Sequence, residues 1–161
     1  IAAIAASRNN VTSILKRMGM QTIGYDKLNQ LRHVRYFKNI DGIRTQMKRH
    51  ADIISPKFQV VLDALEKELA PLGIAQWVKP NGGYFISLNV MDGCAARVVE
   101  LCRQAGVVLT PAGATYPYGK DPRDRNIRIA PTYPPVEELE IAVSLLCLCT
   151  KLAAAEKLLA E

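Results

Sequence analysis

The sequence lacks the long apolar run that a membrane span needs, and it is poor in residues that build metal or disulfide sites. Its apolar start, IAAIAA at residues 1–6, is too short for a membrane span or for the core of a signal peptide. Only two histidines are present, and the four cysteines show no CxxC or Cys/His spacing, so no metal site is expected. We interpret Cys94, Cys102, Cys147 and Cys149 as buried apolar residues of a cytoplasmic protein, because thiols stay reduced there.

The composition that remains is that of an ordinary globular protein, with 49% hydrophobic and 22% charged residues over 161 positions. The net charge of +6 is uneven, because residues 1–60 hold eleven Lys and Arg against three Asp and Glu. This basic third is interpreted as a solvated helical face, and the alternative is a contact surface for nucleic acid, anionic lipid or an acidic partner. Since no initiator Met is present, we expect the chain to be part of a larger protein.

The first half of the sequence predicts helices. Residues 7–10 should cap a helix that ends near Gly19, and a second helical stretch should start near Lys27 and continue past Gly42. Ser55-Pro56 predicts the start of another helix, because proline fits the first helical position. Its apolar face recurs at helical spacing: Phe58, Val61, Leu62, Leu65 and Leu69. The opening six residues are expected to be the buried end of a strand.

The second half alternates strands with helices. Residues 76–78 and 84–88 predict two strands joined by a turn at residues 80–83, and Asp92 is expected to cap a helix that stops at Gly106. A short buried strand at 107–109, a loop at 111–125, a strand at 126–130 and a long final helix should follow. We therefore predict an α/β fold with a small mixed β-sheet covered by helices. Residues 41–161 should form one small domain, and residues 1–40 should be the remnant of a neighbouring domain.

Arg128 is the residue that we single out for chemistry. A guanidinium on a short strand after a long loop can bind a carboxylate through two parallel hydrogen bonds. The alternative is an exposed strand residue paired with Asp121 or Asp124. His33 and His50 have no partner at motif spacing and are interpreted as surface residues.

Three segments carry a family resemblance when they are taken in order: PNGGYF at 80–85, GVVLTPAG at 106–113 and NIRIAP at 126–131. Together they resemble the C-terminal small domain of fold-type I aminotransferases, which depend on pyridoxal 5'-phosphate (PLP). The similarity is strongest to the aspartate-type group that is related to the MocR regulators. One departure is Ala112, which separates Pro111 from Gly113 where relatives commonly have Pro-Gly directly.

The resemblance implies that Arg128 binds the substrate α-carboxylate and that Tyr84 and Phe85 line the substrate entrance. It also implies that residues 1–40 are a remnant of the large PLP-binding domain and that the Schiff-base lysine lies upstream of Ile1. This chain alone should then be inactive, hold no catalytic residue and leave PLP to be bound mainly by the N-terminal part. Lys16, in Ser13–Lys16, matches the Ser-x-x-Lys pattern only nominally, because it lies inside a predicted helix.

The parent enzyme should transfer an amino group between an amino acid and a 2-oxo acid, as a homodimer without membrane or nucleic-acid partners. The alternative from another class is non-catalytic: the ligand-sensing half of a MocR-type transcriptional regulator, or an interaction module that uses the basic third.

Overall fold

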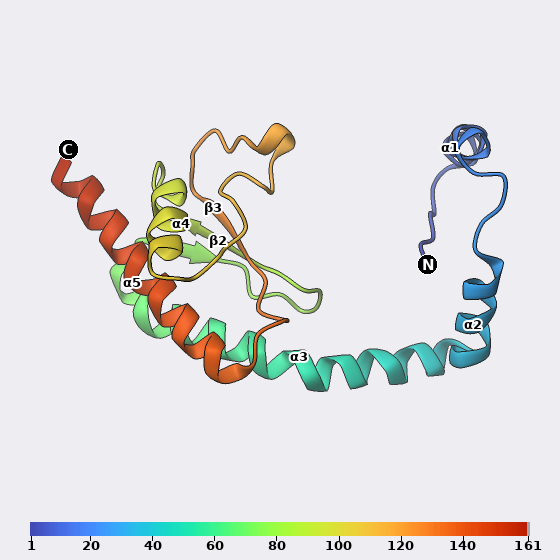
Figure 1. The fold of residues 1–161 in the computed structure, drawn as a ribbon, viewed down its shortest axis with the longest axis horizontal. Coiled ribbons are helices and arrows are strands. Elements are labelled where there is room, and N and C mark those ends of the chain that lie inside the picture. Colours follow the sequence, from blue (N-terminus) through green and yellow to red (C-terminus); the bar gives the residue numbers. More distant parts are fainter. Residues whose placement is uncertain (161) are drawn as a thin grey trace. The chain divides into compact units, whose positions relative to one another are not determined.

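The computed structural model describes residues 1–160, which form two compact units, residues 1–50 (unit 1) and residues 51–160 (unit 2). Figure 1 shows their elements in chain order. The regular elements are α1 (Arg8–Gln21), α2 (Lys27–Phe37), α3 (Ile40–Glu68), η1 (Ala70–Leu72), β1 (Ala75–Trp77), β2 (Ile86–Val90), α4 (Ala95–Gln104), η2 (Pro117–Gly119), β3 (Asn126–Ile129) and α5 (Val136–Ala160). Each unit is described by itself.

Unit 1 consists of capped helices that bury very little. The Ser7 hydroxyl accepts a hydrogen bond from the Asn10 amide at 3.4 Å, which confirms the predicted start of α1. The Asp26 carboxylate accepts one from the Asn29 amide at 2.9 Å and starts α2 in the same way. Neither α1 nor α2 has a buried residue. Their apolar stripes therefore lie open within unit 1.

Two expectations for this region are wrong. Residues 1–6 form no strand, and Ile1 and Ile4 are 70% and 60% exposed. A strand end is buried only between neighbouring strands, and the described part of unit 1 contains none. The second helical stretch is also broken, because Lys38 takes a positive φ of 62° and ends α2. A new helix then starts at Ile40, where the Asn39 side chain accepts the amides of residues 41 and 42.

Helix α3 does not start at Ser55-Pro56, as the sequence suggested, but 15 residues earlier at Ile40, and Pro56 lies inside it. Proline fits a first helical turn, yet a long helix can also hold it at the loss of one backbone hydrogen bond, which costs about 3 kcal/mol. The apolar face that follows is confirmed. Val61, Leu65 and Leu69 are 0% exposed and lie in the core of unit 2.

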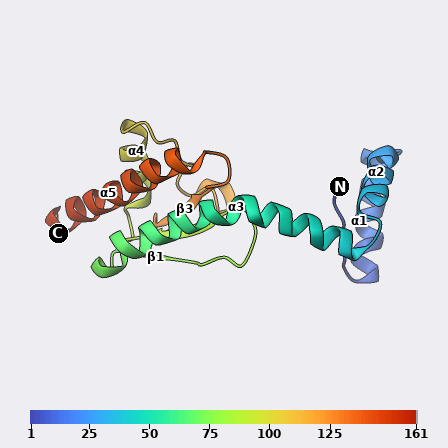
Figure 2. The same cartoon turned by 90° about the horizontal axis from the view of Figure 1, so that it is seen from below.

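Unit 2 has a three-stranded antiparallel sheet in the order β1-β2-β3, with its core on one side. Ile86, Leu88 and Ile127 point from the sheet into that core. In Figures 1 and 2, α5 runs beside the C-terminal part of α3. The Lys151 ammonium lies 2.6 Å from the Glu68 carboxylate and joins the two helices. The α/β class with a small sheet covered by helices is thus confirmed, but the sheet is not mixed as predicted, because the three described strands are all antiparallel.

The predicted strand at 107–109 is absent. The Val107 amide donates to the Cys102 carbonyl at 2.8 Å and closes the end of α4, while Val108 is 86% exposed. Apolar β-branched residues favour a strand, but in the described chain this segment pairs with no other strand. Gly106, with φ of 89°, does end the helix region in the left-handed conformation, as predicted.

Asp92 does not cap α4. The Asp124 carboxylate does, by accepting from the Ala96 amide at 2.9 Å, and its carbonyl accepts from the Ala95 amide at 2.8 Å. The Asp92 carboxylate lies instead 3.3 Å from the Arg123 guanidinium. A cap that comes from 28 residues away in sequence cannot be found by scanning local capping patterns.

No helix in the described range is long and apolar enough to cross a membrane.

Candidate functional site

The face of the sheet opposite the core is polar and carries the candidate site. Along β2 the buried residues alternate with half-buried ones, so Ser87 and Asn89 point to this second face. Register pairs Ser87 with Arg128 and Asn89 with Asn126 on β3. We call these four residues, together with Phe85 just before β2, the polar sheet face.

Asn126 is the hydrogen-bonding centre of the polar sheet face, and only 8% of it is exposed. Its Nδ2 donates to Ser87 Oγ at 2.9 Å and to Asn89 Oδ1 at 2.8 Å. Its Oδ1 accepts from the hydroxyl of Thr115 at 2.6 Å. Because Thr115 belongs to the loop at 111–125, Asn126 fastens that loop to β2 and β3 beside Arg128.

Asp121 closes the same loop from its other end. Its carboxylate accepts the backbone amides of Arg123, Arg125 and Asn126 at 3.0, 2.9 and 2.8 Å. Burial acts to raise the pKa of Asp121, but these backbone hydrogen bonds outweigh it and the pKa is lowered. The charged carboxylate therefore stabilises the turn that leads into β3.

Arg128 projects from β3 with no acceptor of its own. Its Nε is buried and has no hydrogen-bond partner among the described residues. Its Cζ lies 4.6 Å from the centroid of the Phe85 ring. The alternative pairing with a local acid is not observed, since the carboxylates of Asp121 and Asp124 bind backbone amides. The guanidinium is held by an aromatic ring and not neutralised by a carboxylate.

The turn before β2 places the two aromatic residues named from the sequence. Gly83 has φ of 90°, a conformation that favours glycine, and it turns the chain just before Tyr84 and Phe85. Phe85 is 48% exposed and lies against Arg128. Tyr84 is 55% exposed and makes neither a hydrogen bond nor a ring contact to Arg128 in the described structure. The structure therefore brings together Arg128 and Phe85, with Tyr84 beside them in sequence only.

A groove of about 340 Å³ borders Arg128 on the edge of β3. Its walls are apolar and come from residues 107–109, residues 129–131 and the first turns of α5. Among the described residues that line it there is no lysine and no carboxylate, so the groove offers neither an amine to bond to an aldehyde nor an acid to pair with a pyridine nitrogen. The groove therefore does not fit pyridoxal phosphate itself, whereas the guanidinium of Arg128 fits a carboxylate.

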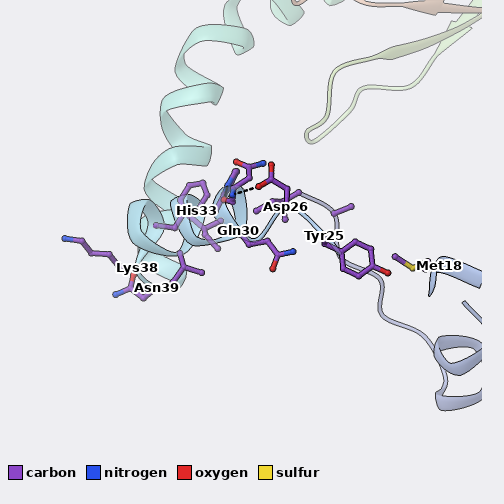
Figure 3. Close-up of a pocket in the computed structure, with 13 residues that line it drawn as sticks. Met18, Tyr25, Asp26, Gln30, His33, Lys38 and Asn39 are labelled. Carbon is purple, nitrogen blue, oxygen red and sulfur yellow. Dashed lines mark hydrogen bonds between the residues drawn. The ribbon is translucent and has the colours of Figure 1, made fainter. Parts of the chain in front are cut away.

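A second hollow, of about 900 Å³, lies within unit 1 (Figure 3). Its labelled side chains include Asp26 and His33. Both are used structurally: Asp26 caps α2, and the His33 Nδ1 lies 2.8 Å from the Asn29 carbonyl oxygen. His33 is half-buried and His50 is exposed, so neither is a strong acid-base candidate.

Comparison with known proteins identifies the family. The family model described as aspartate amino-transferase matches residues 1–161. The chain belongs to this aminotransferase family. An aspartate aminotransferase of Corynebacterium glutamicum is 51% identical over 138 residues, which are 86% of this chain and 32% of that protein. The chain spans about a third of the length of the curated relatives that it matches.

Solved aminotransferases have the same fold. The crystal structure of an aspartate transaminase from Corynebacterium glutamicum matches with a TM-score of 0.87 and 48% identity, over 94% of this chain and 36% of that one. LysN, an α-aminoadipate aminotransferase of Thermus thermophilus, matches with a TM-score of 0.73 over 93% of this chain and 37% of that one. At 18% identity, LysN supports the fold alone. These relatives are named as aminotransferases, which favours that alternative over a regulator.

Sequence reasoning missed the neighbours of Arg128. Ser87, Asn89 and Asn126 were passed over, although the apolar-polar alternation of residues 86–90 places two of them on one face. No sequence pattern marks Thr115 as a neighbour of the site, because its hydrogen bond with Asn126 depends on how the loop at 111–125 folds back.

Proposed function

We propose that this chain is the C-terminal part of a PLP-dependent aminotransferase that moves an amino group between an amino acid and a 2-oxo acid. In this proposal Arg128 binds the α-carboxylate of both substrates, and Tyr84 and Phe85 lie at the substrate entrance. The observation that carries the proposal is the guanidinium of Arg128, which is fixed by Phe85 and paired with no carboxylate among the described residues. Family membership supports the class of reaction.

The chemistry of the two substrates explains why one arginine can serve both half-reactions. An amino acid and a 2-oxo acid differ at the α-carbon, but each carries a carboxylate next to it. A planar guanidinium binds that carboxylate through two parallel N–H donors and fixes the orientation of the adjacent carbon. Holding the reacting carbon in one place lowers the entropic part of the barrier.

The cofactor would act as the electron sink for the bonds at the α-carbon. Since the groove beside Arg128 does not fit it, we propose that PLP is bound mainly by a part of the enzyme N-terminal to this chain, with its lysine. The role of this chain is then to bind the carboxylate and, as the domain closes, to exclude water from the site.

For the organisation of the parent enzyme we propose residues 41–161 as the small domain and residues 1–40 as a remnant of the large domain. The open apolar stripes of α1 and α2 suit a segment that packs on a larger body. We further propose a homodimer that works in the cytoplasm, and light scattering of the full-length protein tests the dimer.

The direct test is to express the full-length gene product with PLP, record its visible spectrum and map any lysine trapped by borohydride reduction. We expect a visible band that reduction abolishes, one modified lysine N-terminal to Ile1, and amino transfer from an amino acid to 2-oxoglutarate. A protein with no such band, no labelled lysine and no transfer would contradict the proposed function.

A further inference from the structure

We infer that Phe85 is a positioning residue, whose ring holds the Arg128 guanidinium in the orientation that binds the substrate carboxylate. Phe85 would then act through Arg128 and not by touching the substrate itself. This inference rests on the proposed role of Arg128 as the residue that binds the substrate carboxylate. It adds that Phe85 orients the Arg128 guanidinium.

The contact between the two side chains is face-on and close. Arg128 Cζ lies 4.6 Å from the centroid of the Phe85 ring, within the range of a cation–π interaction. Of the guanidinium nitrogens, only Nε is closed off from solvent without a hydrogen bond in the described structure. The terminal pair Nη1 and Nη2 is therefore the open edge. A carboxylate that arrives at this edge meets two parallel donors.

The backbone fixes the ring where the guanidinium needs it. Ser87 lies directly opposite Arg128, so Phe85, two residues earlier, is its diagonal neighbour across the two strands. The Val78 amide donates to the Ser87 carbonyl at 3.1 Å and extends the pairing beyond β1. The Gly83 turn then ends the hairpin just before the ring. Phe85 thus directly precedes β2, and its position is set by the paired strand that follows it.

An arginine without this support would bind carboxylates less well. Its long side chain has many rotamers, and only some of them direct the guanidinium N–H donors at the ligand. Selecting one of these on binding costs conformational entropy and lowers the affinity. No hydrogen bond or ion pair within the described residues restrains the Arg128 head group. The Phe85 ring is therefore the main restraint that the structure provides for the plane of the guanidinium.

The variants Phe85→Leu and Phe85→Tyr test the inference in the full-length protein with PLP. Leucine keeps an apolar side chain but has no aromatic ring, whereas tyrosine keeps the ring. For Phe85→Leu we expect KM for the amino acid to rise about threefold to thirtyfold, which matches the usual strength of a cation–π contact, while kcat changes less than about twofold. Phe85→Tyr should leave KM near the value of the parent protein.

Phe58→Leu is the matched control, because it makes the same change in a half-buried ring of α3 that packs against the core. It should lower the melting temperature but leave KM unchanged. Calorimetric titration with succinate, a carboxylate that cannot react, provides a readout independent of turnover. Its affinity should fall by the same factor as KM rises in Phe85→Leu.

A double-mutant cycle with Arg128→Ala tests whether Phe85 acts through Arg128. Alanine leaves no cation for the ring to hold, so Phe85→Leu should add little in that background. If Arg128→Ala raises KM but Phe85→Leu leaves it unchanged, the positioning role is wrong and the proposed function stands. If neither variant raises KM, the assignment of Arg128 itself is wrong.

Discussion

The Nδ2 atom of Asn126 donates to Oδ1 of Asn89 across the strand pair at 2.8 Å, two residues along β3 from Arg128. The same amide group also binds Ser87 and receives the hydroxyl of Thr115. One nearly buried side chain therefore fixes two strands and a loop around the candidate carboxylate site. Substituting Asn126 should therefore weaken the contacts between β2, β3 and the loop at 111–125 without changing Arg128 itself.

Asn126→Ala should lower the free energy of unfolding by about 2–3 kcal/mol, because three hydrogen bonds are lost and their partners are left partly buried. Urea unfolding of the full-length protein, followed by tryptophan fluorescence and circular dichroism, measures this change. Ser87→Ala removes one of the three bonds and should cost about 1 kcal/mol. Equal effects of the two substitutions would show that Asn126 is not the centre of the network.

The loop at 111–125 should loosen in acid. The pKa of Asp121 is lowered in the folded chain, so the stability that its carboxylate contributes is present above the ordinary Asp value of about 3.9 and is lost as pH falls through the lowered value. Protonation weakens its acceptance of three amides. NMR should show the amide signals of Arg123, Arg125 and Asn126 shifting together below about pH 4.

The matching substitution is Asp121→Asn, which keeps an acceptor but removes the charge. It should abolish the concerted shift and make the exchange of the same three amides faster at neutral pH. An Asp121 carboxylate that titrates at or above the ordinary value would contradict this account of the turn.

Core packing of unit 2 predicts a large difference between two positions on α3. Leu65 is 0% exposed, so Leu65→Ala should destabilise unit 2 by about 2–5 kcal/mol, through lost burial and the cavity left behind. Ile53, on the same helix, is 65% exposed, and Ile53→Ala should change stability by less than about 0.5 kcal/mol. Chemical denaturation measures both, and a similar cost at the two positions would mean that the helix face is misassigned.

The four cysteines should be protected from alkylation until the chain unfolds. All four are buried, and burial raises the pKa of Cys102 to about 12 and of Cys147 to about 11, so both remain thiols at neutral pH. Iodoacetamide at about pH 8 should label them only after urea is added, as mass spectrometry would show. Rapid labelling of Cys102 in the native protein would contradict its burial on the face of α4 that packs against α5.

The sequence predicted those features that local patterns encode. The caps at Ser7 and Gly106, the apolar face of α3 and the strand of Arg128 all follow from neighbours within a few residues. It failed at the start of α4, which Asp124 caps from 28 residues away. It also failed at Pro56, because a residue type that favours a helix start is tolerated inside a long helix as well.

In the candidate site, too, local patterns predicted some features, and contacts between separate segments decided the others. Arg128 stood out as a charged residue on an alternating strand, but the task of Phe85 depends on a contact across two strands that spacing does not specify. The strand expected at 107–109 had the right residue types but no partner in the described chain, and strands exist only in pairs.

The most direct test of the central claim is the steady-state kinetics of Arg128→Lys and Arg128→Ala in the full-length protein with PLP. If Arg128 binds the α-carboxylate, kcat/KM for the amino acid and for the 2-oxo acid should fall by a similar factor, about tenfold or more for lysine and further for alanine. Melting temperatures should remain close to that of the parent protein. Unchanged kcat/KM for both substrates in a folded Arg128→Ala protein would contradict the account.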